Sequence, residues 1–124
     1  MKDFEELQKE CLAEVKAAGI TPADKIKWVV NSRAKSRWGL CTRKNNGEYY
    51  EIQISNRLLE DDNISVKSCK DTMIHEILHT CADCMKHTGK WKEYARNMNT
   101  KYGYNIKSTT SGAEKGVENY KAKR

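Results

Sequence analysis

The three histidines of this chain lie close together in the sequence, at positions 75, 79 and 87. His75 and His79 enclose Glu76 in an H-E-x-x-H motif. On an α-helix of about 3.6 residues per turn, residues four apart project from one face, so both imidazoles can reach one ion with Glu76 beside it. Zinc held in this way lowers the pKa of a bound water to about 7, and a glutamate can accept the proton as hydroxide attacks a carbonyl. The motif predicts zinc-dependent hydrolysis of peptide bonds; the alternative is two surface histidines that happen to be four apart.

A zinc site of this type needs a third protein ligand from outside the helix. His87 is the remaining histidine and follows His79 by eight residues, past a plausible helix end. An exposed loop residue is the alternative interpretation of His87. We predict that it is the third ligand.

Cys81 and Cys84 form a C-x-x-C motif, which can indicate zinc binding or redox activity. If the helix runs through residue 85, both thiols lie on the side away from His75 and His79, because each residue turns the helix by about 100°. They would then share an apolar stripe with Ile74, Ile77, Leu78 and Met85. We therefore predict buried core thiols and not metal ligands.

The apolar spacing and the turn residues divide the chain into elements. Asp3 and Glu6 resemble a capping box, and Asn46-Gly47 is a strong hairpin signal. The predicted helices are residues 4–18, 65–85 and 90–102, with a helical turn within 56–63, and the predicted strands are 25–31, 37–44 and 48–55.

These elements predict one α+β domain of the minimal zincin type over residues 1–107, followed by a polar, flexible tail over 108–124. The domain would contain an N-terminal helix, a small antiparallel-leaning three-stranded sheet, the metal helix and a supporting helix. Ile26, Trp28 and Val30 would share one face of the first strand, and Tyr50, Ile52 and Ile54 would face the core from the third.

The composition is that of a soluble globular protein, with 38% hydrophobic and 32% charged residues. The chain has neither a membrane span nor a signal-peptide pattern, so we expect a cytoplasmic protein with its five cysteines reduced. The net charge of +6 would attract polyanions, but the charges are scattered. Charge alone is thus a weak indication of DNA binding.

Two stretches resemble the SprT-like, Spartan-type metallopeptidases: "NSRAKSRWGLCTRKNNGEYYEIQISNRLLED" and "HEILHTCADCMKHTGKWKEYA". The resemblance covers residues 26–106. It implies a zinc-dependent protease with His75, His79 and His87 as ligands and Glu76 as catalytic base. Members of this family are associated with cleavage of proteins bound or crosslinked to DNA, so the resemblance also implies protein substrates of that kind.

The chain departs from the family pattern in two places. Thr88 separates His87 from Gly89, whereas members often have glycine directly after the third histidine. No cysteine follows Cys84 in this sequence, whereas many members carry a cysteine-rich zinc ribbon after the catalytic part, so we do not expect DNA targeting through that element.

Three questions stay open at the level of sequence. Trp38 and Gly39 could form a rim on which an extended substrate adds as a strand, or Trp38 could be core and Gly39 a bulge. Tyr102 and Tyr104 are candidates for stabilising the oxyanion. The alternative function is a non-catalytic, zinc-stabilised nucleic-acid binding module, which would have no use for a carboxylate beside the metal.

Overall fold

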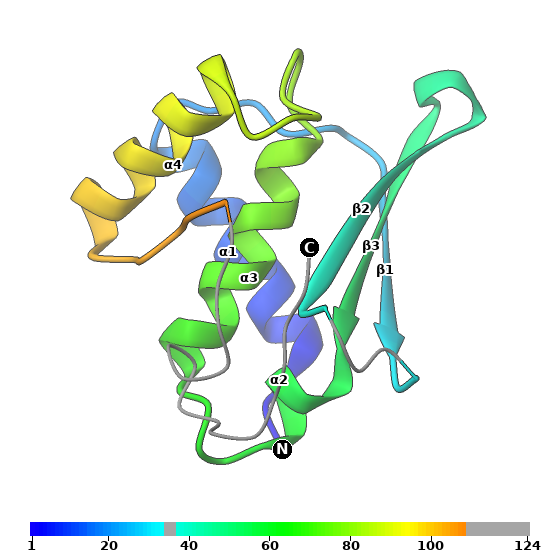
Figure 1. The fold of residues 1–124 in the computed structure, drawn as a ribbon, viewed down its shortest axis with the longest axis vertical. Helices are drawn as coiled ribbons and strands as arrows, with labels where there is room; N and C mark the ends of the chain where they lie inside the picture. The colour runs from blue at the N-terminus through cyan, green and yellow to red at the C-terminus, as the bar shows by residue number, and fades with distance from the viewer. Residues whose placement is uncertain (34–36, 109–124) are drawn as a thin grey trace.

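The described part of the chain, residues 1–33 and 37–108 of a computed structural model, forms an α+β fold (Figure 1). Its helices are α1 (Phe4–Ala17), α2 (Asn56–Glu60), α3 (Val66–His79) and α4 (Gly89–Tyr102), and its strands are β1 (Ile26–Asn31), β2 (Gly39–Lys44) and β3 (Tyr49–Ser55). The predicted fold class is confirmed. The predicted tail, residues 108–124, lies outside the described residues except for Ser108.

Helix α1 begins and ends where the capping residues indicate. The Asp3 carboxylate accepts a hydrogen bond from the Glu6 backbone N–H at 3.1 Å, which satisfies one of the free donors of the first turn. Gly19 follows the helix with a φ of 79°, a left-handed conformation that glycine adopts without steric cost. The buried face carries Leu7, Cys11 and Val15 at four-residue spacing.

The three strands form a mixed sheet in the order β1-β3-β2. β2 and β3 pair antiparallel, as the hairpin signal predicts, whereas β1 pairs parallel to β3. The expectation of an antiparallel-leaning sheet is thus wrong for β1. The end of β1 and the start of β2 lie at the same end of the sheet, where Asn31 pairs with Ser55 and Gly39 with Ile54, and β3 lies between the two strands and runs parallel to β1. Ile52 and Ile54 are fully buried, as predicted, but Val30 is 42% exposed.

The loop between β2 and β3 contains three consecutive residues with positive φ. Asn45, Asn46 and Gly47 have φ values of 50°, 55° and 93°. Asparagine and glycine tolerate this region better than other residues, so the sequence suits the turn.

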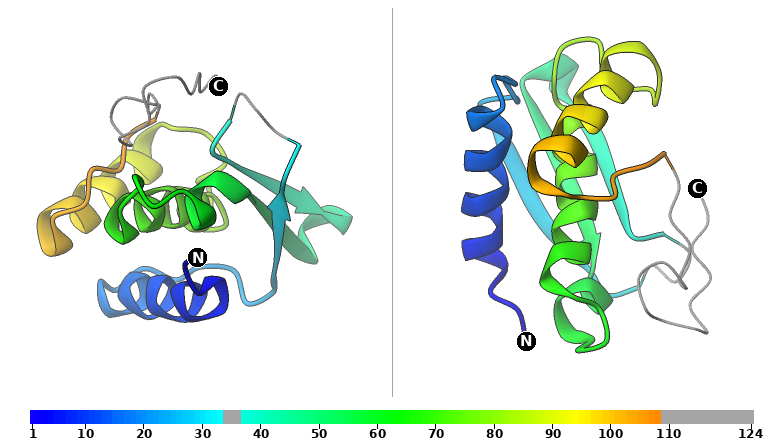
Figure 2. Two further views of the ribbon diagram at one scale, coloured as in Figure 1. Left: turned by 90° about the horizontal axis from the view of Figure 1, so that it is seen from below. Right: turned by 90° about the vertical axis from the view of Figure 1, so that its left-hand side faces the viewer.

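Helix α3 is the central element, contacting α1, α4, β2 and β3. Figure 2 shows α1 and α3 side by side, with the helices together on one side of the sheet. Five apolar residues of α3 have no solvent exposure: Cys69, Met73, Ile74, Ile77 and Leu78. The H-E-x-x-H motif occupies the last turn of this buried helix.

The end of α3 differs from the prediction. The helix stops at His79, six residues earlier than expected, and the chain turns through residues 80–88. The Thr80 hydroxyl donates to the Ile77 carbonyl at 2.7 Å and accepts from the Ala23 N–H at 3.0 Å. Local side-chain bonds of this kind compete with helix continuation. Met85 is consequently 43% exposed and belongs to no apolar stripe.

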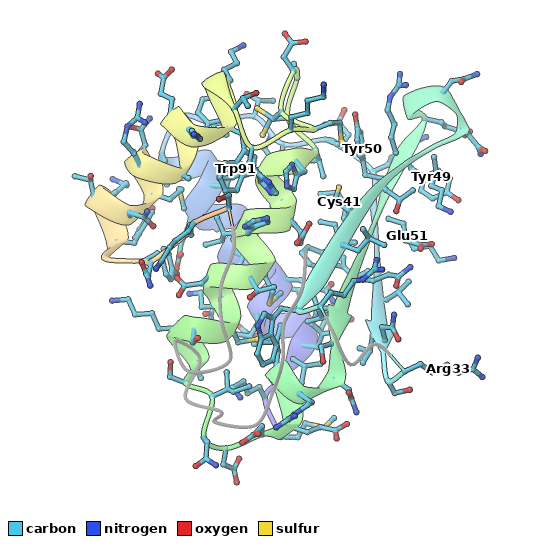
Figure 3. All side chains as sticks on the ribbon, viewed as in Figure 1. Arg33, Cys41, Tyr49, Tyr50, Glu51 and Trp91 are labelled. Atoms are coloured by element: carbon cyan, nitrogen blue, oxygen red, sulfur yellow. The ribbon has the colours of Figure 1, made fainter. Side chains whose placement is uncertain are left out.

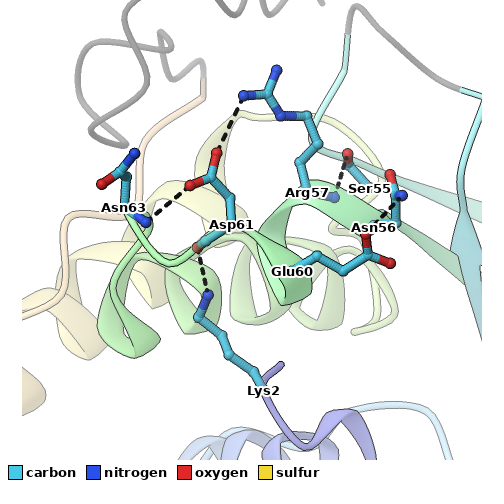
Figure 4. Close-up of polar contacts among 7 residues, drawn as sticks. All are labelled: Lys2, Ser55, Asn56, Arg57, Glu60, Asp61 and Asn63. Atoms are coloured by element: carbon cyan, nitrogen blue, oxygen red, sulfur yellow. Dashed lines mark hydrogen bonds and ion pairs between the residues drawn. The ribbon is translucent and has the colours of Figure 1, made fainter.

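Polar contacts fix the connection from β3 through α2 to α3 (Figure 4). The Ser55 hydroxyl caps α2 by accepting from the Arg57 N–H at 3.3 Å. Asp61 forms an ion pair with Arg57 at 3.2 Å and accepts from the Asn63 N–H at 2.9 Å. Lys2 donates to the Asp61 carbonyl at 3.2 Å, which ties the start of the chain to this connection.

No helix within the described ranges is both long and apolar enough to cross a bilayer.

Candidate metal centre

The three imidazoles converge through their Nε2 atoms. His75 and His79 project from the last turn of α3, and His87 comes from the loop that precedes α4. The Nε2 atom of His87 lies 2.9 Å from that of His79 and 3.0 Å from that of His75. In the described part of the chain these three residues form a group whose ligand atoms lie within 4.8 Å of one another. They could hold a metal ion.

Backbone carbonyls orient two of the rings. Nδ1 of His75 lies 2.9 Å from the Lys107 carbonyl oxygen, and Nδ1 of His79 lies 2.7 Å from that of Cys84. A carbonyl can only accept, so each Nδ1 carries the hydrogen. The Nε2 lone pair of each neutral ring then faces the cluster. This is the outer-shell arrangement typical of metal-ligating histidines.

The electrostatics of His79 favour the neutral ligand form. The residue is 6% exposed. Burial is the main cause that lowers the pKa of its imidazole to about 4, with a smaller lowering from His87 and an opposing effect of the Cys84 carbonyl. At neutral pH the ring is therefore uncharged, as metal binding requires.

Two of the nitrogen separations are close to those of a zinc site. Zinc–nitrogen bonds of about 2.0–2.1 Å in a tetrahedron place two nitrogen ligands roughly 3.3 Å apart. The two Nε2 separations of 2.9 and 3.0 Å are a few tenths of an ångström shorter. A small outward rotation of the rings would accommodate the ion.

Trp91, at the start of α4, supports all three rings (Figure 3). Its ring centroid lies 4.8 Å from that of His75, 5.4 Å from that of His79 and 4.6 Å from that of His87. The indole N–H donates to the His75 carbonyl at 3.3 Å. The sequence indicates Trp91 only as an apolar residue of a supporting helix; its position four residues after His87 is the one available signal for a role at the site.

Glu76 lies beside the cluster and against the sheet. Its Oε2 atom is 3.9 Å from Nε2 of His75, and the residue is 5% exposed. A Cβ atom at Gly39 would lie 2.9 Å from that oxygen, 3.0 Å from Cγ of Glu76 and 3.1 Å from Cγ2 of Thr72. Glycine at this position of β2 therefore leaves the space that the glutamate side chain occupies. Trp38, the other predicted substrate residue, is 3% exposed, and its carbonyl accepts from the Ser55 N–H at 2.8 Å.

A pocket of about 320 Å³ joins these groups. It is bounded by β2 on one side, α3 on another and the segment after α4 on a third. Its lining includes the three histidines and Glu76, together with Trp38, Gly39, Leu40, Cys41, Thr72, Met85, Asn105, Ile106 and Lys107.

The cysteines lie near the cluster without joining it. Because α3 ends at His79, the predicted helical geometry does not apply to Cys81 and Cys84, although both thiols are buried as expected. Burial is the main cause that raises the pKa of Cys81, and also that of Cys41, to about 12. It also raises the pKa of Cys84. These thiols stay protonated at neutral pH, whereas thiolates are the form that binds metal.

No disulfide forms in residues 1–33 and 37–108, which include every cysteine of the chain.

The two tyrosine candidates for oxyanion stabilisation point elsewhere. The Tyr102 hydroxyl donates to the Glu14 carbonyl at 3.2 Å, and that of Tyr104 donates to the Glu14 carboxylate. Both bonds run to α1, and neither tyrosine lines the pocket.

Comparisons with known proteins agree with the geometry. A search of curated proteins found no match to the chain. A family model, that of the SprT-like family, matches residues 3–111. This match covers α1, α2, α3, α4, the whole sheet and the segment after α4. The chain belongs to the SprT-like family.

Proposed function

We propose that this protein is a zinc-dependent endopeptidase that hydrolyses peptide bonds of protein substrates. The observation that carries the proposal is the convergence of three imidazole Nε2 atoms next to a buried carboxylate in one pocket. Membership of the SprT-like family supports it. A closed structural zinc site would have a fourth protein ligand. Within the described residues the group of potential ligands contains the three histidines alone.

Three imidazole ligands suit zinc among the common divalent ions, because magnesium and calcium prefer oxygen ligands. His75, His79 and His87 would hold the ion. Zinc supplies a water of lowered pKa and polarises the carbonyl under attack. Proton transfer and substrate binding would depend on residues of the protein.

Glu76 would act as general base. Its carboxylate would accept the proton of the attacking water and then deliver it to the leaving amine, for which it must lie within hydrogen-bond reach of both. Its position beside His75 and against Gly39 of β2 supports this role.

Strand β2 offers a place for an extended substrate. Trp38 pairs with β3 through its carbonyl, and backbone direction alternates along a strand, so Gly39 and Cys41 direct their N–H and C=O groups away from β3. β2 stands at the end of the strand order and lines the pocket. A peptide added along this edge would run past Glu76. Gly39 would then contribute backbone hydrogen bonds, and Trp38 would contribute packing of the pocket wall.

Proteins associated with or crosslinked to DNA are the substrate class that we propose. The resemblance to Spartan-type peptidases and the net charge of +6 support this choice. Diffuse positive charge raises the concentration of protein near DNA without selecting a sequence.

The test is the substitution Glu76→Gln, compared with Glu93→Gln at an exposed position of α4. Each removes one negative charge, but only the first removes the proposed base. We expect Glu76→Gln to retain about one zinc per chain and to lose about 10²- to 10⁴-fold in cleavage of an unstructured protein. Glu93→Gln should behave like the unmodified protein. Undiminished cleavage by Glu76→Gln would refute the mechanism, and absence of stoichiometric zinc from the unmodified chain would refute the metal centre.

A further inference from the structure

The segment after α4, residues 104–107, returns from the far end of α4 to the metal-binding helix (Figure 1). Successive residues of this segment are each held by another part of the protein. Tyr104 donates its hydroxyl hydrogen to Glu14 of α1, and the Asn105 N–H donates to the Asp71 carboxylate of α3 at 3.0 Å. The segment ends at the Lys107 carbonyl, which accepts from Nδ1 of His75.

Asn99 makes the most specific contact with this segment. Its side-chain Nδ2 donates to the Ile106 carbonyl at 3.0 Å, and its Oδ1 accepts from the Ile106 N–H at 2.8 Å. One amide side chain thus holds both backbone polar groups of the residue directly before Lys107. The Ile106 side chain is 5% exposed, so the same residue is also fixed by packing.

We infer that Asn99 is a positioning residue for the metal centre, acting on His75 through Ile106 and the Lys107 carbonyl. This inference rests on the proposed metal-binding function. The two hydrogen bonds fix the peptide groups on both sides of Ile106, the second of which leads directly into Lys107, and this restricts where the Lys107 carbonyl can meet the imidazole. That carbonyl keeps the hydrogen of His75 on Nδ1 and the lone pair on Nε2, in the orientation that faces His79 and His87.

The inference predicts an effect on metal binding from a residue that lines no part of the pocket. Loss of an outer-shell partner of a metal ligand typically weakens metal binding about 10- to 100-fold. Removing Asn99 should have an effect of this size, because the Lys107 carbonyl would lose its fixed direction and His75 would gain rotational and tautomeric freedom.

The experiment compares Asn99→Ala with Asn97→Ala in the full chain. Asn97 is an exposed asparagine on the same helix, so it controls for the loss of an amide and for helix propensity. Zinc affinity is measured by competition with a chelator. The visible absorption of the cobalt-substituted protein at saturating cobalt reports the geometry of the ligands, which a purely structural role of Asn99 would leave unchanged.

We expect Asn99→Ala to bind zinc about 10- to 100-fold more weakly and to shift the cobalt spectrum. Asn97→Ala should match the unmodified protein in both. Asn99→Asp retains the acceptor for the Ile106 N–H but places a carboxylate oxygen against the Ile106 carbonyl, so it should also weaken zinc binding. Asn99→Asp takes the place of Asn99→Ala if the alanine variant does not fold.

Unchanged affinity and spectrum in a folded Asn99 variant would overturn the inference while the metal centre stands. If the unmodified chain itself binds no zinc, both the inference and the proposed function fail.

Discussion

At the scale of single residues, the site depends on which nitrogen of each imidazole carries the hydrogen. Two backbone carbonyls settle this for His75 and His79. The spacing of the histidines in the sequence predicts that they can meet, because residues four apart share a helix face. It does not predict the carbonyls, because any residue type can supply a backbone oxygen.

Gly39 provides a prediction at the same scale. Gly39→Ala would bring a methyl group within 3.0 Å of two Glu76 atoms, so the glutamate side chain must shift from its position beside His75. We expect a loss of about 10²-fold in activity, as is typical when a catalytic group is misplaced by roughly 1 Å. Zinc stoichiometry should be retained, since none of the three histidines is touched.

A double-mutant cycle with Glu76→Ala checks the cause. The free energy of unfolding should fall by about 1–3 kcal/mol for Gly39→Ala alone and by less in the Glu76→Ala background, where only the Thr72 contact remains. An equal loss in both backgrounds would mean that the strain lies in the strand itself.

At the scale of elements, the early end of α3 is what allows His87 to reach the cluster. The loop of residues 80–88 reverses the chain, and the Cys84 carbonyl within it accepts from His79. Asp83 adopts a positive φ of 61° in this reversal. A helix continued to residue 85 would have carried the chain away from the site.

The C-x-x-C motif in this loop should be dispensable for metal binding. The double substitution Cys81→Ala and Cys84→Ala should retain one zinc per chain and destabilise the fold by about 1 kcal/mol per site, since both thiols are buried and protonated. His87→Ala should lose zinc or bind it far more weakly. Metal analysis and thermal unfolding measure the two effects.

Cys11→Ala, a buried thiol on α1, is the matched control for packing loss alone. Loss of zinc from the Cys81 and Cys84 variant, with zinc retained by His87→Ala, would contradict the assignment of ligands.

The elements that the sequence predicts well are those with local signals. The cap at Asp3, the turn at Asn46-Gly47 and the apolar spacing of α1 and α4 act over a few residues. The end of α3 and the parallel pairing of β1 were not predictable in this way. Thr80 bonds to Ala23, and β1 pairs with residues 24 positions later in the chain, as in Ile26 with Tyr50.

At the scale of the whole molecule, a polar network joins α1 to the elements around the metal centre. Lys70 of α3 is 9% exposed and donates to Glu10 at 3.1 Å and to Glu14 at 2.7 Å. Burial alone would lower the pKa of Lys70, but its hydrogen bonds, that to Glu14 foremost, outweigh burial and raise it. Through Tyr104, Glu14 also holds the segment of residues 104–107, whose Lys107 carbonyl contacts His75.

The net charge of +6 leads to a prediction about DNA. We expect weak, sequence-independent binding whose affinity falls steeply as salt rises, because scattered Lys and Arg act by counterion release. Binding of single- and double-stranded DNA of unrelated sequences between about 50 and 200 mM salt measures this, over a range in which 6–10 phosphate contacts lose roughly 10³- to 10⁵-fold in affinity. Tight binding that ignores salt would reveal a dedicated DNA site instead.

The strand order also predicts which strands pair first during folding. The β2–β3 hairpin closes over a short loop, and hairpins of this kind form in about 1–10 μs. β1, the parallel partner of β3, is separated from it in the chain by the whole of β2. Such non-local pairing is slower because chain entropy is lost before contacts compensate for it. Pulse-labelling hydrogen exchange during refolding should therefore show amides shared by β2 and β3 protected before those between β1 and β3. The Gly39–Glu76 contact would follow only once α3 docks on this early hairpin.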